Sequence, residues 1–403
     1  MSAPQPPDAT PPLTADEHAR YARQLALPLV GEAGQRRLKA ARVLLVGAGG
    51  LGAPVALYLA AAGVGALTLA DDDRVDASNL HRQVLYGTRD VGRPKLEAAA
   101  ERLRDVNPHV HVDARPGYLT AADARALVAG HDVVVDGTDN FAARYAVNDA
   151  CAALGVPNVY GSVHRFEGQV SVFAAPDPRA PGGRGPCYRC LYPAPPPDGL
   201  VPNCAEGGVL GVLPGVVGTL QAAEALKLLL GVGDPLVGRL LVVDALAMRF
   251  LPVAVQRRAD CPACGDAARA AGFPHVVDAL ASDAPPACAP DGAGAPTAEV
   301  TAAELAALLA GPRAPQVVDV REAHEWAAGH LAGARHAPLA RLGAALDRDP
   351  LDPRAPVVTV CASGVRSARA AERLRARGAS DVRSLAGGLA AWRAAGGELV
   401  GGS

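Results

Sequence analysis

The sequence predicts an α/β protein in which two parallel-sheet domains are joined by a linker. Three observations support this fold class. Apolar, β-branched runs alternate with helical patterns from Arg42 to about Val255, which is the pattern of βαβ units. The segment "ASDAPPACAPDGAGAP", rich in Ala, Pro and Gly, then interrupts this alternation. Beyond it, "QVVDVRE" and "PVVTVC" predict buried parallel strands of a second, smaller domain.

The expected elements of the first domain follow in chain order. Strands are predicted at "RVLLV", "ALTLA", "VHVDA", "DVVVDGT" and "VPNVYGS", and the later runs "GQVSVFAAP" and "LLVVDALAMRFLPVAV" predict antiparallel additions. Helices are predicted at Leu51–Ala62, Pro94–Val106 and Phe141–Leu154. The stretch from Ala175 to Cys204 is dense in Pro and Gly and predicts a long surface loop.

Length, charge and hydropathy exclude several classes of protein. The 403 residues suffice for two or three domains, and a formal charge of −2 offers no basic field for nucleic acid. Residues 1–16 lack the basic and apolar parts of an export signal, so they predict a disordered leader on a cytoplasmic protein. The most apolar stretch, Val209–Val232, contains Gln221, Glu224 and Lys227, so we expect no membrane contact.

Two CxxC pairs stand out among the eight cysteines, which we expect to be reduced because no export signal is present. "PCYRCLYP" supplies Cys187 and Cys190, and "DCPACGD" supplies Cys261 and Cys264. Four thiolates in two chelating pairs predict a tetrahedral zinc site. A redox dithiol is the alternative, but neither pair lies at a strand–helix junction, where such dithiols occur.

A glycine-rich turn follows the first strand. "VLLVGAGGLG" places Gly47, Gly49 and Gly52 in the G-x-G-x-x-G pattern, directly before a helix. Glycines let the backbone approach a phosphate, and the helix N-terminus offers free N–H groups, so the motif predicts a nucleotide site. A tight turn that only packs the helix on the strand is the alternative. Asp71 ends the next strand, where a carboxylate can bind the ribose of NAD or of ATP.

Further polar residues favour ATP over NAD. Adenylyl transfer needs cations beside the leaving pyrophosphate and a carboxylate for Mg²⁺, whereas hydride transfer needs neither. Taken singly, each of these residues could equally be a solvated loop charge. They lie in loops after the predicted strands: Asn79, Arg82, Gln83, Lys95, Asp136 and Asp139.

Near the end of the chain, "VVTVCASGVRSAR" places Cys361 in a loop of small residues before a helix. A cysteine acts as a nucleophile in its thiolate form, and here backbone N–H groups, the helix N-terminus and Arg366 would stabilise negative charge on sulfur. Four residues separate Cys361 from Arg366, and so short a loop suits sulfur better than phosphate. A buried structural cysteine is the alternative, but it would leave Gly364 and Arg366 without a purpose.

The segments "RYARQLAL", "GAGGLGAPVALYLAAAGVGALTLADDDRVDASNLHRQ", "VGRPK" and "DGTDNFAARY" resemble E1-like activating enzymes of the ThiF, MoeB and HesA type over residues 17–265. The resemblance implies a Rossmann-like ATP-binding domain that adenylates the C-terminal glycine of a ubiquitin-like sulfur-carrier protein ending in Gly-Gly. It implies a structural zinc, Mg²⁺ on Asp139, and Arg23 reaching the ATP of the partner in a homodimer. The implied nucleotide-binding residues are Gly47, Gly49, Gly50, Gly52, Asp71, Asp73, Asn79, Arg82, Gln83, Lys95 and Asp139.

After a flexible linker over 266–297, "VVDVREAHEWAAGHLAGARHAPL" and "LAGGLAAW" resemble a single-copy rhodanese domain over residues 298–400. This resemblance implies that Cys361 carries a persulfide, supplied by thiosulfate or a cysteine desulfurase, and that Asp319 and Arg321 stabilise the fold. The whole chain then resembles adenylyltransferase/sulfurtransferases of the MoeZ and MOCS-three type, which serve molybdopterin, thiamine, cysteine or tRNA thiolation. Cys204 could be an inert thiol or a second catalytic cysteine.

Two other functions remain open from the sequence. An NAD-dependent oxidoreductase with a redox cysteine domain would use the same glycine loop, but no catalytic His or Tyr arrangement stands out. A non-catalytic scaffold could bind a ubiquitin-like partner without chemistry. It would need neither Cys361 nor the set formed by Arg82, Lys95 and Asp139.

Overall fold

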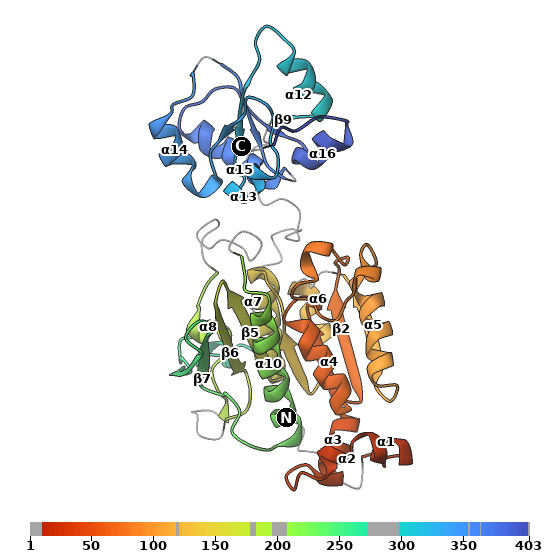
Figure 1. Cartoon of the computed structure of the whole chain (residues 1–403). Coiled ribbons are helices and arrows are strands. Elements are labelled where there is room, and N and C mark those ends of the chain that lie inside the picture. The colour runs from red at the N-terminus through yellow and green to blue at the C-terminus, as the bar shows by residue number, and fades with distance from the viewer. Residues whose placement is uncertain are drawn as a thin grey trace. The chain divides into compact units, whose positions relative to one another are not determined.

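A computed structural model shows two compact units, Met1–Pro285 and Pro286–Ser403. Figure 1 draws the first unit in red to teal and the second in teal to blue, and each is described by itself. The residues whose structure is described are 10–117, 121–177, 183–195, 208–272, 298–353, 355–362 and 364–401.

The first unit is built on an eight-stranded sheet of order β3-β2-β1-β4-β5-β6-β7-β8. The first five strands in this order are parallel and the last three pair antiparallel, as the sequence predicts. The order reverses between β1 and β4, and ligands of such sheets bind at the carboxyl ends of the strands beside this reversal. The strands are β1 (Arg42–Val46), β2 (Ala66–Asp71), β3 (His111–Pro116), β4 (Val133–Asp136), β5 (Asn158–His164), β6 (Glu167–Phe173), β7 (Arg239–Asp244) and β8 (Arg249–Ala254).

The central strands are mostly apolar, with residues of both orientations buried, because helices cover both faces of the sheet. Along β1, Val43 and Leu45 belong to one hydrophobic core, and Leu44 and Val46 belong to another. This alternation follows from the two-residue period of a strand. The first core is completed by α4, α5 and α10, and the second by α6 and α7 (Figure 1).

The three helices whose bounds were predicted match α4, α5 and α7 to within one residue, and the other helices of this unit were given no predicted bounds. The two shortest loop helices, η2 and η3, lie in the connection between β2 and α5. The helices are α1 (Ala15–Arg20), α2 (Ala22–Leu25), α3 (Gly31–Ala40), α4 (Gly52–Ala62), η2 (Ala77–Asn79), η3 (Thr88–Asp90), α5 (Lys95–Val106), α6 (Ala121–Val128), α7 (Phe141–Leu154), α8 (Tyr188–Leu191), α10 (Val212–Leu230) and α11 (Asp266–Ala270).

Helix α10 is the core helix of the first unit. Its 19 residues are long and apolar enough to cross a membrane by length and composition alone. Two of its polar residues, Gln221 and Glu224, are however buried against protein. The buried Gln221 amide donates to the carbonyls of Asp136 and Val159, at 2.8 and 3.1 Å, and Glu224 accepts from the backbone N–H of Leu236. The helix therefore holds together the ends of β4 and β5.

Three segments that we expected to be irregular are partly ordered. The leader predicted for residues 1–16 is ordered from residue 10, because Arg36 and Lys39 donate to the carbonyls of Thr10 and Pro12. The linker predicted from residue 266 begins with α11, and 273–297 lie outside the described residues. The predicted surface loop contains α8, which is mostly buried.

The edges of the eight-stranded sheet are β3 and β8. Every residue of β8 is exposed, including Phe250, Leu251 and Val253. Each edge strand contains a proline, Pro116 in β3 and Pro252 in β8. Proline offers no backbone N–H, which is why it is tolerated in edge strands.

The second unit is a five-stranded, fully parallel sheet of order β11-β10-β12-β13-β9, covered on both faces. Alternate residues again separate two cores, with Val318 in one and Val317 in the other. Cys361 follows the central strand β12 directly. The elements are β9 (Glu299–Val300), α12 (Ala302–Leu309), β10 (Gln316–Asp319), α13 (Ala323–Ala327), β11 (Arg335–His336), η6 (Leu339–Arg341), α14 (Leu342–Arg348), β12 (Val357–Val360), α15 (Val365–Ala376), β13 (Val382–Leu385) and α16 (Gly388–Ala394).

A buried ion pair organises the end of β10. The Arg321 guanidinium donates to both carboxylate oxygens of Asp319, at 2.7–3.0 Å, and to the carbonyl of Gly329 at 2.7 Å. Asp319 is fully buried and Arg321 is 6% exposed. The pair joins the strand to the loop after α13, which agrees with the fold-stabilising role expected for both residues.

We predict that Arg321→Met destabilises the second unit, because it leaves the carboxylate of Asp319 buried without a partner. The free energy of unfolding should fall by about 3–5 kcal/mol. Both tryptophans, Trp326 and Trp392, lie in this unit, so urea denaturation followed by tryptophan emission reports on it selectively. The control is Arg341→Met, which replaces an exposed arginine of the same unit. A loss below about 1 kcal/mol, the range of a surface pair, would contradict the prediction.

Candidate functional site

The glycine loop lies at the carboxyl end of β1, beside the reversal in strand order. Gly47 has a φ of +89°, and a Cβ there would lie 2.8 Å from the carbonyl oxygen of Gly137, after β4. A Cβ on Gly52 would lie 1.9 Å from the carbonyl oxygen of Gly47. Both positions therefore require glycine. Directly after the loop, the 11-residue α4 presents its N-terminus, which suits a phosphate.

Asp71, at the end of β2, braces this loop. Its carboxylate accepts from the backbone N–H of Ala48 at 2.7 Å and from that of Asp73 at 2.9 Å. The buried Lys95 ammonium lies 2.7 Å from Asp73 Oδ2 and 3.9 Å from Asp71 Oδ1. Burial raises the pKa of the Asp71 carboxyl, and Lys95 opposes that shift. A cation is thus held beside the phosphate loop by two carboxylates.

The connection between β2 and α5 packs against the other side of the loop. Asn79 Oδ1 accepts from Gln83 Nε2 at 2.8 Å and from Arg82 Nη2 at 3.1 Å. Both side chains contact the glycine loop closely. If Gly49 carried a Cβ, that atom would lie 3.6 Å from Gln83 Nε2, and a Cβ on Gly50 would lie 3.5 Å from Arg82 Cγ. The structure therefore brings Asn79, Arg82, Gln83 and Lys95 together around the glycine loop.

The two aspartates after β4 differ in their surroundings. Asp136 is fully buried, and its carboxylate accepts from the backbone N–H and the hydroxyl of Thr138 at 3.0 and 2.6 Å. Burial raises the pKa of this carboxyl, so Asp136 shapes the loop instead of serving as an open ligand. Asp139, one residue beyond Thr138, is exposed at the end of the loop. Of the pair, it is the carboxylate available to a metal ion.

Arg144, which the sequence analysis did not single out, holds this loop in place. Its Nη2 donates to the carbonyl of Thr138 at 2.7 Å, and its Nε lies 3.9 Å from Asp136 Oδ2. The guanidinium lies over the ring of Tyr160 at 5.1 Å and over that of Tyr188 at 5.9 Å. The signal in the sequence was an arginine one turn into the helix after "DGTDN", where a side chain can reach back to the loop.

Arg23 lies apart from this cluster within one chain. It is exposed on α2, which packs at the C-terminal end of α4, where Gln24 donates to the carbonyl of Ala62. The glycine loop precedes the N-terminus of that same helix, roughly 15 Å away. Its predicted role across a homodimer interface stays a prediction.

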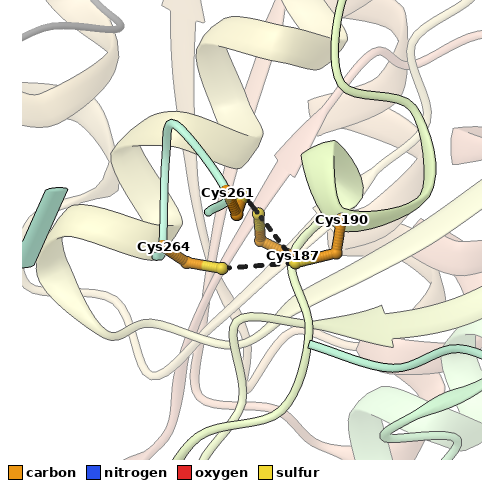
Figure 2. Close-up of side chains that lie close together, drawn as sticks. All are labelled: Cys187, Cys190, Cys261 and Cys264. Carbon is orange, nitrogen blue, oxygen red and sulfur yellow. Dashed lines mark hydrogen bonds between the residues drawn. The ribbon is translucent and has the colours of Figure 1, made fainter. Parts of the chain in front are cut away.

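The four cysteines of the CxxC pairs meet in one cluster (Figure 2). Their sulfur atoms all lie within 4.8 Å of one another, and the closest contacts are 3.4–4.0 Å. The edge of a tetrahedral zinc–tetrathiolate site measures about 3.8 Å, from a Zn–S bond of about 2.3 Å. Cys187 and Cys190 come from the start of α8, and Cys261 and Cys264 from the segment after β8. All four are buried, so the site is closed.

Residues from α7 fix the first CxxC turn. Arg189 Nε and Nη2 donate to the carboxylate of Asp149, both at 2.8 Å, and the backbone N–H of Tyr188 donates to the Asn148 side chain at 2.6 Å. The same helix carries Arg144, so α7 contacts both the cysteine cluster and the loop that bears Asp139. Sequence spacing gave no sign of these contacts.

Of the other cysteines before residue 298, one lies in a hydrophobic core and two lie outside the described residues. Cys151 on α7 is fully buried, and burial raises the pKa of its thiol well above the usual value, as expected for an inert core residue. Cys204 lies outside the described residues, as does Cys288 in the predicted linker.

In the second unit, Cys361 lies at the base of a closed turn after β12. The backbone N–H of Gly364 donates to its Sγ at 3.1 Å, and Ser367 Oγ lies 3.4 Å from the same sulfur. Gly364 has a φ of +99° and directly precedes α15, whose N-terminus therefore faces the sulfur. A thiolate or a persulfide at this position would be stabilised by these dipoles.

Arg366 is paired with a carboxylate. Its guanidinium donates two hydrogen bonds, both of 2.7 Å, to the carboxylate of Glu325 on α13. Arg366 holds the pKa of Glu325 down at about 2, so the pair is ionised at neutral pH. The charge expected to stabilise the sulfur of Cys361 is therefore largely neutralised by a partner that the sequence analysis missed.

Comparison with known proteins identifies this architecture. A family model described as ThiF family matches residues 21–263, and one described as Rhodanese-like domain matches residues 301–395. The chain belongs to the ThiF family. It is 44% identical to the probable adenylyltransferase/sulfurtransferase MoeZ of Mycobacterium tuberculosis over 97% of both chains. It is also 41% identical to the adenylyltransferase and sulfurtransferase MOCS3 of Sus scrofa, over 97% of this chain and 88% of that protein.

Two further similarities concern the first unit of this ThiF-family chain. The sulfur carrier protein adenylyltransferase of Thermus thermophilus is 56% identical over 63% of this chain and 93% of its own length. A crystal structure of E. coli MccB covers 61% of this chain and 75% of its own, with a TM-score of 0.54 and 22% identity, and supports the fold alone. The predicted union of an adenylyltransferase with a sulfurtransferase is confirmed, which disfavours the oxidoreductase and the scaffold.

We predict that Gly52→Ala lowers ATP affinity at least about tenfold, equivalent to about 1.4 kcal/mol, because the new methyl group would collide with the carbonyl of Gly47 and open the loop. Gly215→Ala is the matched control, because a Cβ at that helical position meets nothing within 4 Å. Calorimetric titration with a non-hydrolysable ATP analogue measures both. Equal affinities for the two variants would show that the loop does not bind the phosphates.

Proposed function

We propose that the first unit adenylates the C-terminal glycine of a ubiquitin-like sulfur-carrier protein and that the second supplies sulfur from a persulfide on Cys361. One observation supports this most strongly. A phosphate loop with the buried Lys95 and a cradled cysteine occur in one chain whose full length aligns with adenylyltransferase/sulfurtransferases. The printed name of the Thermus thermophilus relative, a sulfur carrier protein adenylyltransferase, suggests the class of acceptor.

The adenylation half follows from the charges around the glycine loop. The carrier carboxylate attacks the α-phosphorus of ATP, a P–O bond breaks and pyrophosphate leaves. Lys95 and Arg82 would face the phosphates and offset the growing negative charge, while α4 binds them through its N-terminus. Asp139 is the exposed carboxylate that would hold Mg²⁺, which spreads charge on the triphosphate when bound. The product acyl-adenylate is electrophilic, because AMP is a good leaving group.

The sulfur half uses Cys361. The terminal sulfur of its persulfide attacks the acyl carbon and displaces AMP, which forms an acyl disulfide. A second thiol then attacks the Cys361 sulfur, so the thiocarboxylate leaves and a new disulfide forms that a cellular thiol reduces. Cys204 or an external thiol would serve as that second thiol.

The four-cysteine cluster would hold a structural zinc ion. The sulfur separations fit a tetrahedral site, and burial of all four thiols leaves no open position for a substrate. Such an ion would join α8 to the segment after β8. We further propose a homodimer completed by Arg23, a cytoplasmic location, and a place in molybdopterin, thiamine, cysteine or tRNA thiolation, with thiosulfate or a cysteine desulfurase as sulfur source.

We predict that incubation with a carrier ending in Gly-Gly, Mg-ATP, thiosulfate and a reductant converts the carrier to its thiocarboxylate. Intact-mass spectrometry detects the replacement of one oxygen by sulfur. Cys361→Ala should abolish that mass gain while pyrophosphate release persists, and Lys95→Ala should abolish both. Cys151→Ser is the control. Thiocarboxylate formation at the normal rate in Cys361→Ala would refute the assignment of Cys361 as the residue that donates sulfur. If no pyrophosphate were released with any of several carrier proteins, the proposed adenylation would be refuted.

We predict one zinc ion per chain, measured by plasma mass spectrometry of the purified protein. Cys264→Ser should lose the ion and lower the unfolding temperature, because the segment after β8 is then no longer tied to α8. Cys151→Ser removes an equally buried thiol that lies outside the cluster and should retain the zinc. Full zinc content in Cys264→Ser, or a metal-free parent protein, would contradict the assignment.

A further inference from the structure

The ion pair between Glu325 and Arg366 lies at the reactive loop of the second unit. Arg366 is in the first turn of α15, beside Ser367, whose hydroxyl contacts the sulfur of Cys361. Both side chains are partly buried, at 23% and 24% exposure for Glu325 and Arg366. The pair therefore sits at the border between the buried cysteine and solvent, where a sulfur donor must approach.

The helix that carries Glu325 is held firmly. The backbone N–H of Glu322 donates to Glu325 Oε2 at 3.0 Å, so the carboxylate also caps its own turn. The ring of the next residue, Trp326, stacks on those of His330 and His336, with distances between ring centroids of 3.5 and 4.8 Å. Glu325 therefore approaches Arg366 from a fixed position, and the pairing does not depend on a flexible chain.

The pairing changes the electrostatics of the loop. A bidentate carboxylate occupies two donor groups of the guanidinium and cancels its charge. Arg321, the neighbouring guanidinium, is bound to Asp319. A dianion such as thiosulfate would thus gain no attraction from Arg366, although a free guanidinium at this position would bind it. A persulfide with little net charge would not depend on such an attraction.

We propose that Glu325 determines the sulfur-donor specificity of the Cys361 loop by holding Arg366 away from anionic donors. This inference rests on the proposed sulfurtransferase role. In either donor reaction the Cys361 thiolate attacks the outer sulfur and a sulfur–sulfur bond breaks. The electron pair leaves on sulfite when thiosulfate is the donor, or on a thiolate when a persulfide is the donor. Glu325 is a positioning residue, because it acts through Arg366.

The test uses the full chain, with cyanide as acceptor and thiocyanate as the measured product. Glu325→Gln should raise kcat/KM for thiosulfate about tenfold at low ionic strength, mainly by lowering KM, because the positive charge of Arg366 is then left uncompensated and attracts the dianion. The gain should vanish in the double variant with Arg366→Ala and shrink at high salt. With cysteine persulfide as donor, kcat/KM should change less than about twofold. Glu398→Gln, an exposed carboxylate outside the loop, is the control.

Other results would overturn the inference. If Glu325→Gln left kcat/KM for thiosulfate unchanged or lowered it, Glu325 would not be what limits the reaction with thiosulfate. The same conclusion would follow if neither the parent protein nor the variant used thiosulfate. An equal gain with both donors would indicate a general effect on the loop. Tryptophan emission during urea unfolding checks that Glu325→Gln keeps its fold. Failure of the proposed function itself would look different, because Cys361 would then gain no sulfur in mass spectra with either donor.

Discussion

The geometry of the first unit depends on the close backbone contact between the loops that follow β1 and β4. Gly47 and Gly52 meet each other and Gly137 at distances that exclude any side chain. Neighbouring parallel strands place their carboxyl ends at one edge of the sheet, so this contact forms at the reversal in strand order. The glycine loop and the loop that bears the exposed Asp139 both take their positions from it. The geometry of the candidate site thus depends on residues that have no side chain.

Helix α7 extends this constraint to the cysteine cluster. Its first turns hold the loop after β4 through Arg144, and its later turns hold the first CxxC turn through Asp149. The rings of Tyr160 and Tyr188 both lie beside the Arg144 guanidinium. The buried cysteine cluster, for which we propose a structural zinc ion, is therefore connected to the glycine loop through one helix.

Much of this could be predicted from the sequence, because the information is local. Continuous apolar, β-branched runs predict β1 and β12, and the spacing of Gly47, Gly49 and Gly52 predicts the turn between strand and helix. The cysteine cluster was predictable despite its long separation because two CxxC pairs can supply the four ligands of one tetrahedral metal site. Pairings without such a chemical requirement were not. Glu325 meets Arg366 across 41 residues, and no local pattern records that contact. The order within residues 183–195 likewise comes from burial against α7, which composition does not reveal.

The two prolines at the edges of the eight-stranded sheet have a consequence for behaviour in concentrated solution. An open edge is a template onto which another molecule can add a strand through backbone hydrogen bonds. At Pro116 and Pro252 the edge lacks the N–H that an added strand would need. Although β8 exposes apolar side chains, fibre-like growth from either edge is thereby interrupted.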